Sequence, residues 1–359
     1  MKISTKMMSA FLAVVAAVSF TACSSSGEPD STASTGSEQS SSEAVQEGGS
    51  STGESESESY KIGVLQFATH ASLDNCYEGF VQGLEEEGLK EGENLEIEFQ
   101  NAQNDTANSD MIAKNMVAEK VDLLAGIATP AAMSEYSAAK DTDIPVIFTA
   151  VSDPVSTGIV KSLEEPGTNC TGTSDVLPLE EQVKMIRAFL PDASKIGIIY
   201  TTSEPNSISQ LETIKGIAPN YGFEIVEVGV TNSSEVAAAA ATIVAKGADC
   251  FNNFTDNNVV DNLSIVLQAA NEAGIPVFGS EVEQVKNGCL ASQSIDYVEL
   301  GKETGRMAAR VLRGEDASKI PVFTVEEFVP VYNEAVCADL GLTLPEEYQN
   351  AQAVSADAE

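Results

Sequence analysis

Short polar turns, each following an apolar segment, carry the side chains of this sequence that could bind a small molecule. Several turns place a polar residue before a proline, as in Thr129-Pro130, Asp153-Pro154 and Glu204-Pro205. Proline fits the first position of a helix and the polar residue caps it, so each turn predicts a helix start. A helix start presents free backbone N–H groups, which suit a carboxylate. The candidate ligand-binding residues in these turns are Gln66, His70, Thr129, Ser152, Asp153, Ser203, Asn206, Ser207, Asp256 and Asn257.

Catalytic chemistry has little support in the sequence. His70 is the single histidine, and as a general base it would need a nucleophile or charged partner that no motif supplies. The six cysteines show no metal-binding spacing, so neither a metal nor a cofactor is expected. One enzymatic alternative stays open, a two-lobed racemase that would need Cys76 and Cys250 to face one cleft.

Alternating strands and helices are expected to position the turns. Leu73, Tyr77, Phe80 and Leu84 recur at helical spacing and form one apolar face. Strand–helix alternation predicts parallel sheets covered by helices on both faces. Strands are expected at residues 61–67, 95–100, 122–127, 146–150, 195–200, 224–229, 249–254 and 276–278.

The alternation occurs twice, which predicts two similar α/β lobes. Residues 61–150 form one series and residues 195–280 a second, and each opens with a Lys-Ile-Gly segment. In open α/β sheets, ligands bind beyond the carboxyl ends of the strands. The polar turns are therefore expected around one cleft between the lobes.

Six blocks of the sequence together resemble one protein family. They are Gln66 with His70-Ala71-Ser72-Leu73-Asp74, Thr129-Pro130-Ala131-Ala132, Val151-Ser152-Asp153-Pro154-Val155, Ser203-Glu204-Pro205-Asn206-Ser207, Thr255-Asp256-Asn257 and Ile295-Asp296-Tyr297-Val298-Glu299-Leu300-Gly301. The combination resembles the substrate-binding family of ABC importers whose studied members bind tryptophan and other aromatic amino acids. The resemblance spans residues 60–348, and Ser72 stands where the family more often has proline.

The resemblance implies an α/β fold of the type I periplasmic binding protein class. In that fold two Rossmann-like lobes with parallel sheets are joined by a hinge that the chain crosses three times, here expected near residues 172–177, 292–297 and 323–328. The expected parts are a first lobe of residues 60–174 and 295–323, a second lobe of residues 175–294 and 324–348, and a tail of residues 349–359.

The resemblance also implies a non-enzymatic receptor that captures a small ligand by hinge closure and delivers it to ABC permease subunits. For an amino acid ligand, Asp256 or Asp296 would hold the ammonium group. The carboxylate would meet Thr129, Ser152, Ser203 and Ser207, and the side chain would meet Phe67, Tyr77, Phe148 or Phe254. A sugar or another small metabolite is the alternative ligand, although sugar receptors of this fold usually stack their ligand on tryptophan and this chain has none.

The first residues are typical of a lipoprotein signal peptide. Lys2 and Lys6 precede a short apolar run, and small residues lead to Cys23, as in a bacterial lipobox. Residues 1–22 are the expected signal peptide, and Cys23 is the expected lipidated residue. Residues 24–59 contain 14 Ser and eight acidic residues without Lys or Arg, which predicts a disordered tether over residues 23–59. The expected location is the outer face of the cell membrane, through the lipid anchor.

The net charge excludes some partners. Asp and Glu number 55 against 19 Lys and Arg, so the formal charge is −36. Such a field repels phosphate backbones, and no nucleic-acid partner is expected.

Overall fold

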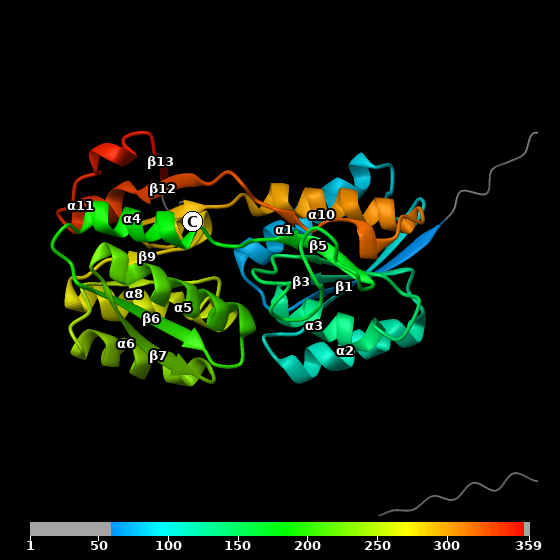
Figure 1. The fold of residues 1–359 in the computed structure, drawn as a ribbon, viewed down its shortest axis with the longest axis horizontal. Helices are drawn as coiled ribbons and strands as arrows, with labels where there is room; N and C mark the ends of the chain where they lie inside the picture. The colour runs from blue at the N-terminus through cyan, green and yellow to red at the C-terminus, as the bar shows by residue number, and fades with distance from the viewer. Residues whose placement is uncertain (1–58, 355–359) are drawn as a thin grey trace, which may run out of the picture. The chain divides into compact units, whose positions relative to one another are not determined.

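The computed structural model describes residues 59–354, which form two α/β lobes (Figure 1). The predicted signal peptide, Cys23 and nearly all of the tether lie outside the described residues. Within residues 59–354, no helix combines the length and the apolar character needed to cross a bilayer.

The first lobe is built on a six-stranded sheet with the order β11-β5-β4-β3-β1-β2, in which every pair of neighbours is parallel. Both faces are covered by helices, and β3 (Leu123–Ile127), in the middle of the sheet, is accordingly apolar throughout. The other elements are β1 (Tyr60–Gln66), β2 (Leu95–Asn101), β4 (Val146–Thr149), β5 (Cys170–Ser174), β11 (Phe323–Thr324), α1 (Ala71–Glu86), α2 (Thr106–Glu119), α3 (Thr129–Ala139) and α10 (Tyr297–Leu312).

The second lobe contains a parallel sheet with the order β7-β6-β8-β9 and a smaller sheet with the order β10-β12-β13. Its strands are β6 (Lys195–Thr201), β7 (Glu224–Val230), β8 (Cys250–Asn252), β9 (Val277–Phe278), β10 (Ala291–Ser294), β12 (Val329–Asn333) and β13 (Gln352–Val354). Its helices are α4 (Leu179–Phe189), α5 (Pro205–Ile217), α6 (Val236–Ala245), α7 (Asn257–Asp261), α8 (Leu263–Ala273), α9 (Val282–Lys286) and α11 (Glu334–Asp339).

The chain passes between the lobes three times. It leaves the first lobe after β5, returns between β10 and α10, and leaves again between β11 and β12. The predicted fold class is therefore confirmed, and each of the eight predicted strands is present.

Two features differ from the sequence-based expectation. The turn at Asp256 predicts one helix over residues 257–271, but the structure divides it at Asn262 into α7 and α8, and the side-chain amide of Asn262 donates to the carbonyl of Asn258 at 2.8 Å. Asn competes with the helical hydrogen bonds in this way and favours helix ends. Within the expected tail, Gln352–Val354 forms β13, which pairs with β12 in parallel.

Helices α1 and α10 lie side by side against the first sheet (Figure 1). Their backbones touch through glycines: a Cβ on Gly79 would collide with the carbonyl oxygen of Val298, and one on Gly301 would collide with that of Cys76. The two helices run in the same direction, so both begin at the same end of the lobe. That end carries the carboxyl ends of the strands.

We predict that Gly301→Ala lowers the free energy of unfolding by about 1–3 kcal/mol, because the methyl group overpacks a contact between two backbones. Gly216→Ala is the matched control, since no atom lies within 4 Å of its Cβ position near the end of α5. Ala is the better helix former, so this control should gain about 0.5–1 kcal/mol. Urea unfolding measures both values. A Gly301→Ala protein as stable as the wild type would contradict the packing of α1 on α10.

Candidate functional site

A cavity lies where the carboxyl ends of β3 and β4 in the first lobe face helix starts of the second lobe. The atom-free space there is ≈ 360 Å³, part of it open to solvent. Its lining comes from both lobes and from the crossings between them. The lining residues are His70, Ser72, Leu73, Ala128, Thr129, Ala150, Ser152, Asp175, Asn206, Thr255, Asn257, Val260, Glu281, Gln284 and Tyr297.

Three helix starts at this cavity lack a side-chain cap. Helices α1, α3 and α5 receive no capping hydrogen bond from His70, Ala128 and Glu204 respectively. For each of these helices, a residue in the first turn or next to it lines the cavity. For α3 this residue is Thr129. The first backbone N–H groups of a helix have no partner within it, and they carry the positive end of its dipole. This arrangement suits an anionic group on a ligand.

Two alanines in the lining have strained backbones. Ala128, after β3, has φ 78° and ψ 155°, and Ala150, after β4, has φ 55°. These regions are rarely adopted by residues other than glycine, and such strain concentrates at binding sites. The strained peptides turn the chain from each strand toward the cavity.

The lining also contains two buried carboxyl groups. Asp175 accepts hydrogen bonds from the hydroxyls of Ser152 and Tyr297, both at 2.9 Å. Glu281 accepts from the backbone N–H groups of Glu283 at 2.6 Å and Gln284 at 2.8 Å. Burial raises the pKa of Asp175, and it raises that of Glu281 to about 7.

The described residues that line the cavity include no Lys or Arg. A cationic group on a ligand would supply the missing countercharge, and so would keep these carboxyl groups ionised. The cavity therefore offers separate places for an anion and for a cation.

Hydrogen bonds cross between the lobes around the cavity. The Nε2 of His70 lies 3.3 Å from the Oδ1 of Asn257, and the amide of Gln210 donates to the hydroxyl of Ser152 at 3.0 Å. Outside the cavity, Ser209 donates to Asp153 at 2.7 Å. The lobes are thus in contact across the site.

Five of the residues that the sequence singled out lie in the cavity lining. They are His70, Thr129, Ser152, Asn206 and Asn257. Four of them, all except Ser152, lie in the first turn of a helix or immediately before it, as the polar turns predicted. They come from both lobes, so the structure brings them together at one place.

The two carboxylates expected to hold an ammonium group lie elsewhere. Asp256 is fully buried and accepts from the N–H and hydroxyl of Thr201, the hydroxyl of Ser207 and the N–H of Val259. Asp296 is exposed and accepts from the N–H groups at the start of α10. Neither lines the cavity, so both expectations are corrected: each carboxylate caps a helix, and Ser207 supports a cap.

Three more predicted binding residues are outside the lining. The amide of Gln66 donates to Asp74 at 2.8 Å, inside the first lobe. Asp153 accepts from Ser209 and from the backbone N–H of Ser156, and these bonds lower its pKa despite partial burial. Ser203 is exposed.

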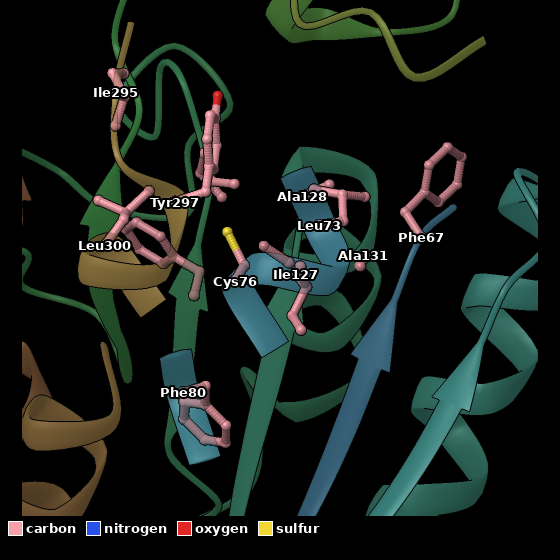
Figure 2. Packing of buried hydrophobic residues seen from close by; sticks show 14 of the residues in the cluster. Phe67, Leu73, Cys76, Phe80, Ile127, Ala128, Ala131, Ile295, Tyr297 and Leu300 are labelled. Carbon is pink, nitrogen blue, oxygen red and sulfur yellow. The ribbon is translucent and has the colours of Figure 1, made fainter. Parts of the chain in front are cut away.

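The predicted aromatic contacts are also corrected. Phe148 and Phe254 are fully buried in the core, and Phe67 and Tyr77 do not reach the cavity either. Figure 2 shows Phe67 and Tyr297 at opposite sides of the apolar cluster, with the hydroxyl of Tyr297 pointing away from it. Tyr297 is the aromatic residue in the lining.

The thiols do not support an enzymatic site. Cys76 and Cys250 are fully buried, and neither lines the cavity. Burial raises the pKa of both thiols, which keeps them protonated. The racemase alternative required both thiols in one cleft, so the structure contradicts it.

Sequence reasoning missed Asp175, Glu281, Gln284 and Tyr297. Asp175 follows β5, whose polar sequence Cys-Thr-Gly-Thr-Ser shows no apolar alternation. Glu281 and Gln284 belong to the short helix α9 and its cap. Tyr297 belongs to one of the six sequence blocks that carry the family resemblance, and this was the signal that could have identified it as a site residue.

Comparison with known proteins identifies the family. Residues 61–355 match the family described as ABC transporter substrate binding protein. The chain belongs to this family. It is therefore the substrate-binding protein of an ABC transporter, as the resemblance implied.

A curated relative is the tyrosine-binding protein of Clostridioides difficile (strain R20291), which is 44% identical over 273 residues, 76% of this chain and 78% of the relative. Two solved structures are also similar. An ABC domain from Streptococcus pneumoniae in complex with L-Trp is 36% identical, with a TM-score of 0.79 over 82% of this chain and 100% of that chain. A substrate-binding protein with adhesive properties from Clostridium difficile, in a ligand-free, open structure, is 42% identical, with a TM-score of 0.64 over 83% of this chain and 100% of that chain.

The order of the two TM-scores differs from the order of the identities. The L-Trp complex superposes better although its sequence is less similar. A hinge motion lowers a whole-chain superposition without changing either lobe. The arrangement of this substrate-binding protein therefore resembles the ligand-bound relative more than the open one, in agreement with the hydrogen bonds between its lobes.

We predict that Asp256→Asn lowers the free energy of unfolding by about 1–3 kcal/mol, because two of the four buried donors then face an amide N–H instead of a carboxylate oxygen. Asp296→Asn is the matched control: it is exposed, and Asn caps helices about as well as Asp. Thermal unfolding of the ligand-free proteins gives both values. Normal stability combined with a loss of more than about 30-fold in amino acid affinity would restore the ammonium-binding role of Asp256.

Proposed function

We propose that this protein captures a free aromatic amino acid, tyrosine or tryptophan, for import through an ABC transporter. The observation that carries the proposal is the pairing, in one cavity, of uncapped helix starts with buried carboxyl groups that lack a cation. An amino acid is a zwitterion and matches both. The names of the similar proteins, a tyrosine-binding protein and an L-Trp complex, support the aromatic class.

In the proposed complex the ligand carboxylate lies at the start of α3. Thr129 is buried there and follows the strained Ala128. The ligand ammonium lies against Asp175, whose two oxygens each accept one hydrogen bond from the protein and retain further acceptor capacity. The Oδ1 of Asn206 is buried without a partner among the described residues and offers another acceptor.

Hinge closure completes the proposed site. The first lobe contributes Thr129, the second contributes Asn206, and Asp175 stands in the first crossing. A ligand held by all three gains its contacts only when the lobes are closed. The closed complex is the form that the permease subunits would receive.

The location proposed for the protein follows from its family and its first residues. Substrate-binding proteins of ABC transporters are extracytoplasmic. We propose that Cys23 carries lipid and that residues 24–59 tether the binding unit to the outer face of the membrane. Both segments precede the folded unit in the sequence.

The proposed function is tested by calorimetric titration with L-Tyr, L-Trp and a panel of sugars. We expect an aromatic amino acid to bind and the sugars to fail. Asp175→Asn should weaken amino acid binding by about 30-fold to several thousand-fold, the usual result of removing one partner of a buried charge pair. Glu281→Gln is the comparison variant, since that carboxyl group is engaged by the start of α9.

A tyrosine analogue without the ammonium group separates a ligand contact from a structural effect. Asp175→Asn should change its affinity little, because the contact that the variant removes is already missing. Equal losses for L-Tyr and for the analogue would show that Asp175 only supports the hinge. A sugar that binds while every amino acid fails would contradict the proposed function.

We predict that Cys23→Ala moves the protein from the membrane fraction to the soluble fraction. The segment after Cys23 has no apolar stretch that would hold it on the membrane. Immunoblots of fractionated cells measure the distribution, and Cys76→Ala is a control in a buried thiol that has no part in anchoring. A Cys23→Ala protein that stays wholly with the membrane would contradict the lipid anchor.

A further inference from the structure

We propose that His70 makes the site selective for an aromatic amino acid whose side chain carries a hydrogen-bond donor, a phenol or an indole, over one with a plain phenyl ring. The inference rests on the proposed function, because it takes the ligand to be an aromatic amino acid. It concerns a different part of the ligand from the ammonium and carboxylate groups. It is carried by a chain of hydrogen bonds that determines which atom of the imidazole is left for the ligand.

The chain begins at Glu204, a buried carboxylate of the second lobe. The side-chain amide of Asn257 donates to its Oε2 at 2.7 Å, and the backbone N–H of Asn257 donates to the same oxygen at 3.0 Å. Burial raises the pKa of Glu204 to about 8, so the geometry decides which atom accepts. The backbone N–H of Asn257 can only donate, so Oε2 is an acceptor and the side-chain amide nitrogen of Asn257 faces it. The Oδ1 of Asn257 therefore faces the other way, toward His70.

This orientation of Asn257 fits only one tautomer of the His70 imidazole. Because Oδ1 of Asn257 accepts, the Nε2 of His70, 3.3 Å away, carries the proton and donates. Burial of His70 outweighs the nearby Asp74 and lowers the pKa of the imidazole, which is therefore neutral. A neutral imidazole protonated at Nε2 has a bare Nδ1, which can only accept a hydrogen bond.

The bare Nδ1 is buried and has no partner among the described residues, and the ring lines the cavity. A ligand carboxylate cannot satisfy this atom, since both are acceptors. A phenol O–H or an indole N–H can. A phenyl ring would leave Nδ1 unpaired in a closed site.

His70 lines both the cavity and a neighbouring surface groove, as do Val260 and Glu281, whereas Asp175 and Asn206 of the proposed ammonium site line only the cavity. An amino group held at Asp175 and Asn206 therefore leaves His70 for the other end of the ligand. Leu73 and Val260 supply apolar surface for a ring beside it.

The effect expected is moderate to large. Leaving one buried acceptor unpaired corresponds to a loss of about 5- to 150-fold in affinity. Sites that hydrogen-bond a substrate hydroxyl reject the analogue that lacks it more strongly than apolar pockets reject a change of size. We therefore expect L-Tyr to bind this protein at least about 5-fold more tightly than L-Phe.

Calorimetric titration with L-Tyr and L-Phe tests the proposal. His70→Leu should bring the ratio of the two affinities close to one, and His70→Gln, which keeps an acceptor, should retain part of it. Ser209→Ala is the matched control: it removes the bond to Asp153, a contact between the lobes outside the cavity. It should weaken both ligands by the same factor, so loss of closure and loss of selectivity have different signatures.

The single histidine of this chain allows a direct second measurement. In protein labelled with ¹⁵N-histidine and purified without a histidine tag, the described sequence gives one pair of ring nitrogen signals. We expect the Nε2–H tautomer in the free protein. L-Tyr should shift the Nδ1 signal as it becomes hydrogen-bonded, and L-Phe should leave it in place.

Equal affinity of the wild type for L-Tyr and L-Phe would overturn the proposal, and so would a His70→Leu protein that keeps the wild-type ratio. Both results would leave the proposed amino acid receptor intact. Absence of binding by L-Tyr, L-Trp and L-Phe alike would overturn the proposed function and this inference with it.

Discussion

The close contact between α1 and α10 is the constraint from which the rest of the site follows. Gly79 and Gly301 let the two helix backbones touch, and any side chain there would force them apart. Because the helices run in the same direction, His70 before α1 and Tyr297 at the start of α10 arrive at one end of the first lobe. The chain comes from the second lobe before it enters α10, so this contact also fixes one hinge crossing against the wall of the cavity.

Helix capping divides the electrostatics of the site. Helices α7, α9 and α10 are capped by Asp256, Glu281 and Asp296, so their positive ends are already neutralised. Helices α1 and α3 of the first lobe have no such cap, and their N–H groups are left for a ligand. The cavity thus combines the free helix ends of α1, α3 and α5 with the buried carboxyl groups of Asp175 and Glu281, which suits a zwitterion bound there.

Much of the architecture could be predicted from the sequence, because apolar segments of strand length alternate with helical periodicity. The polar turns also predicted the neighbourhood of the site. Individual roles were harder to predict, since successive side chains at a helix start point about 100° apart. Asp256 turns back to cap its helix while Asn257, the next residue, faces the cavity. Asp175 follows a strand of small polar residues whose burial comes from the surrounding sheet, and no local pattern indicates it.

The same polar groups explain why closure and binding are coupled. In the closed lobes, the Nδ1 of His70 and the Oδ1 of Asn206 are buried without partners among the described residues. Each such atom costs about 1–3 kcal/mol, because it has given up water and gained nothing. Around these two atoms the lobes contact each other through a few hydrogen bonds between side chains, such as the one between His70 and Asn257. A ligand that supplies the missing donors removes the cost of closure, while an open form returns the same atoms to water. The unpaired acceptors therefore link occupancy of the site to the conformation of the hinge.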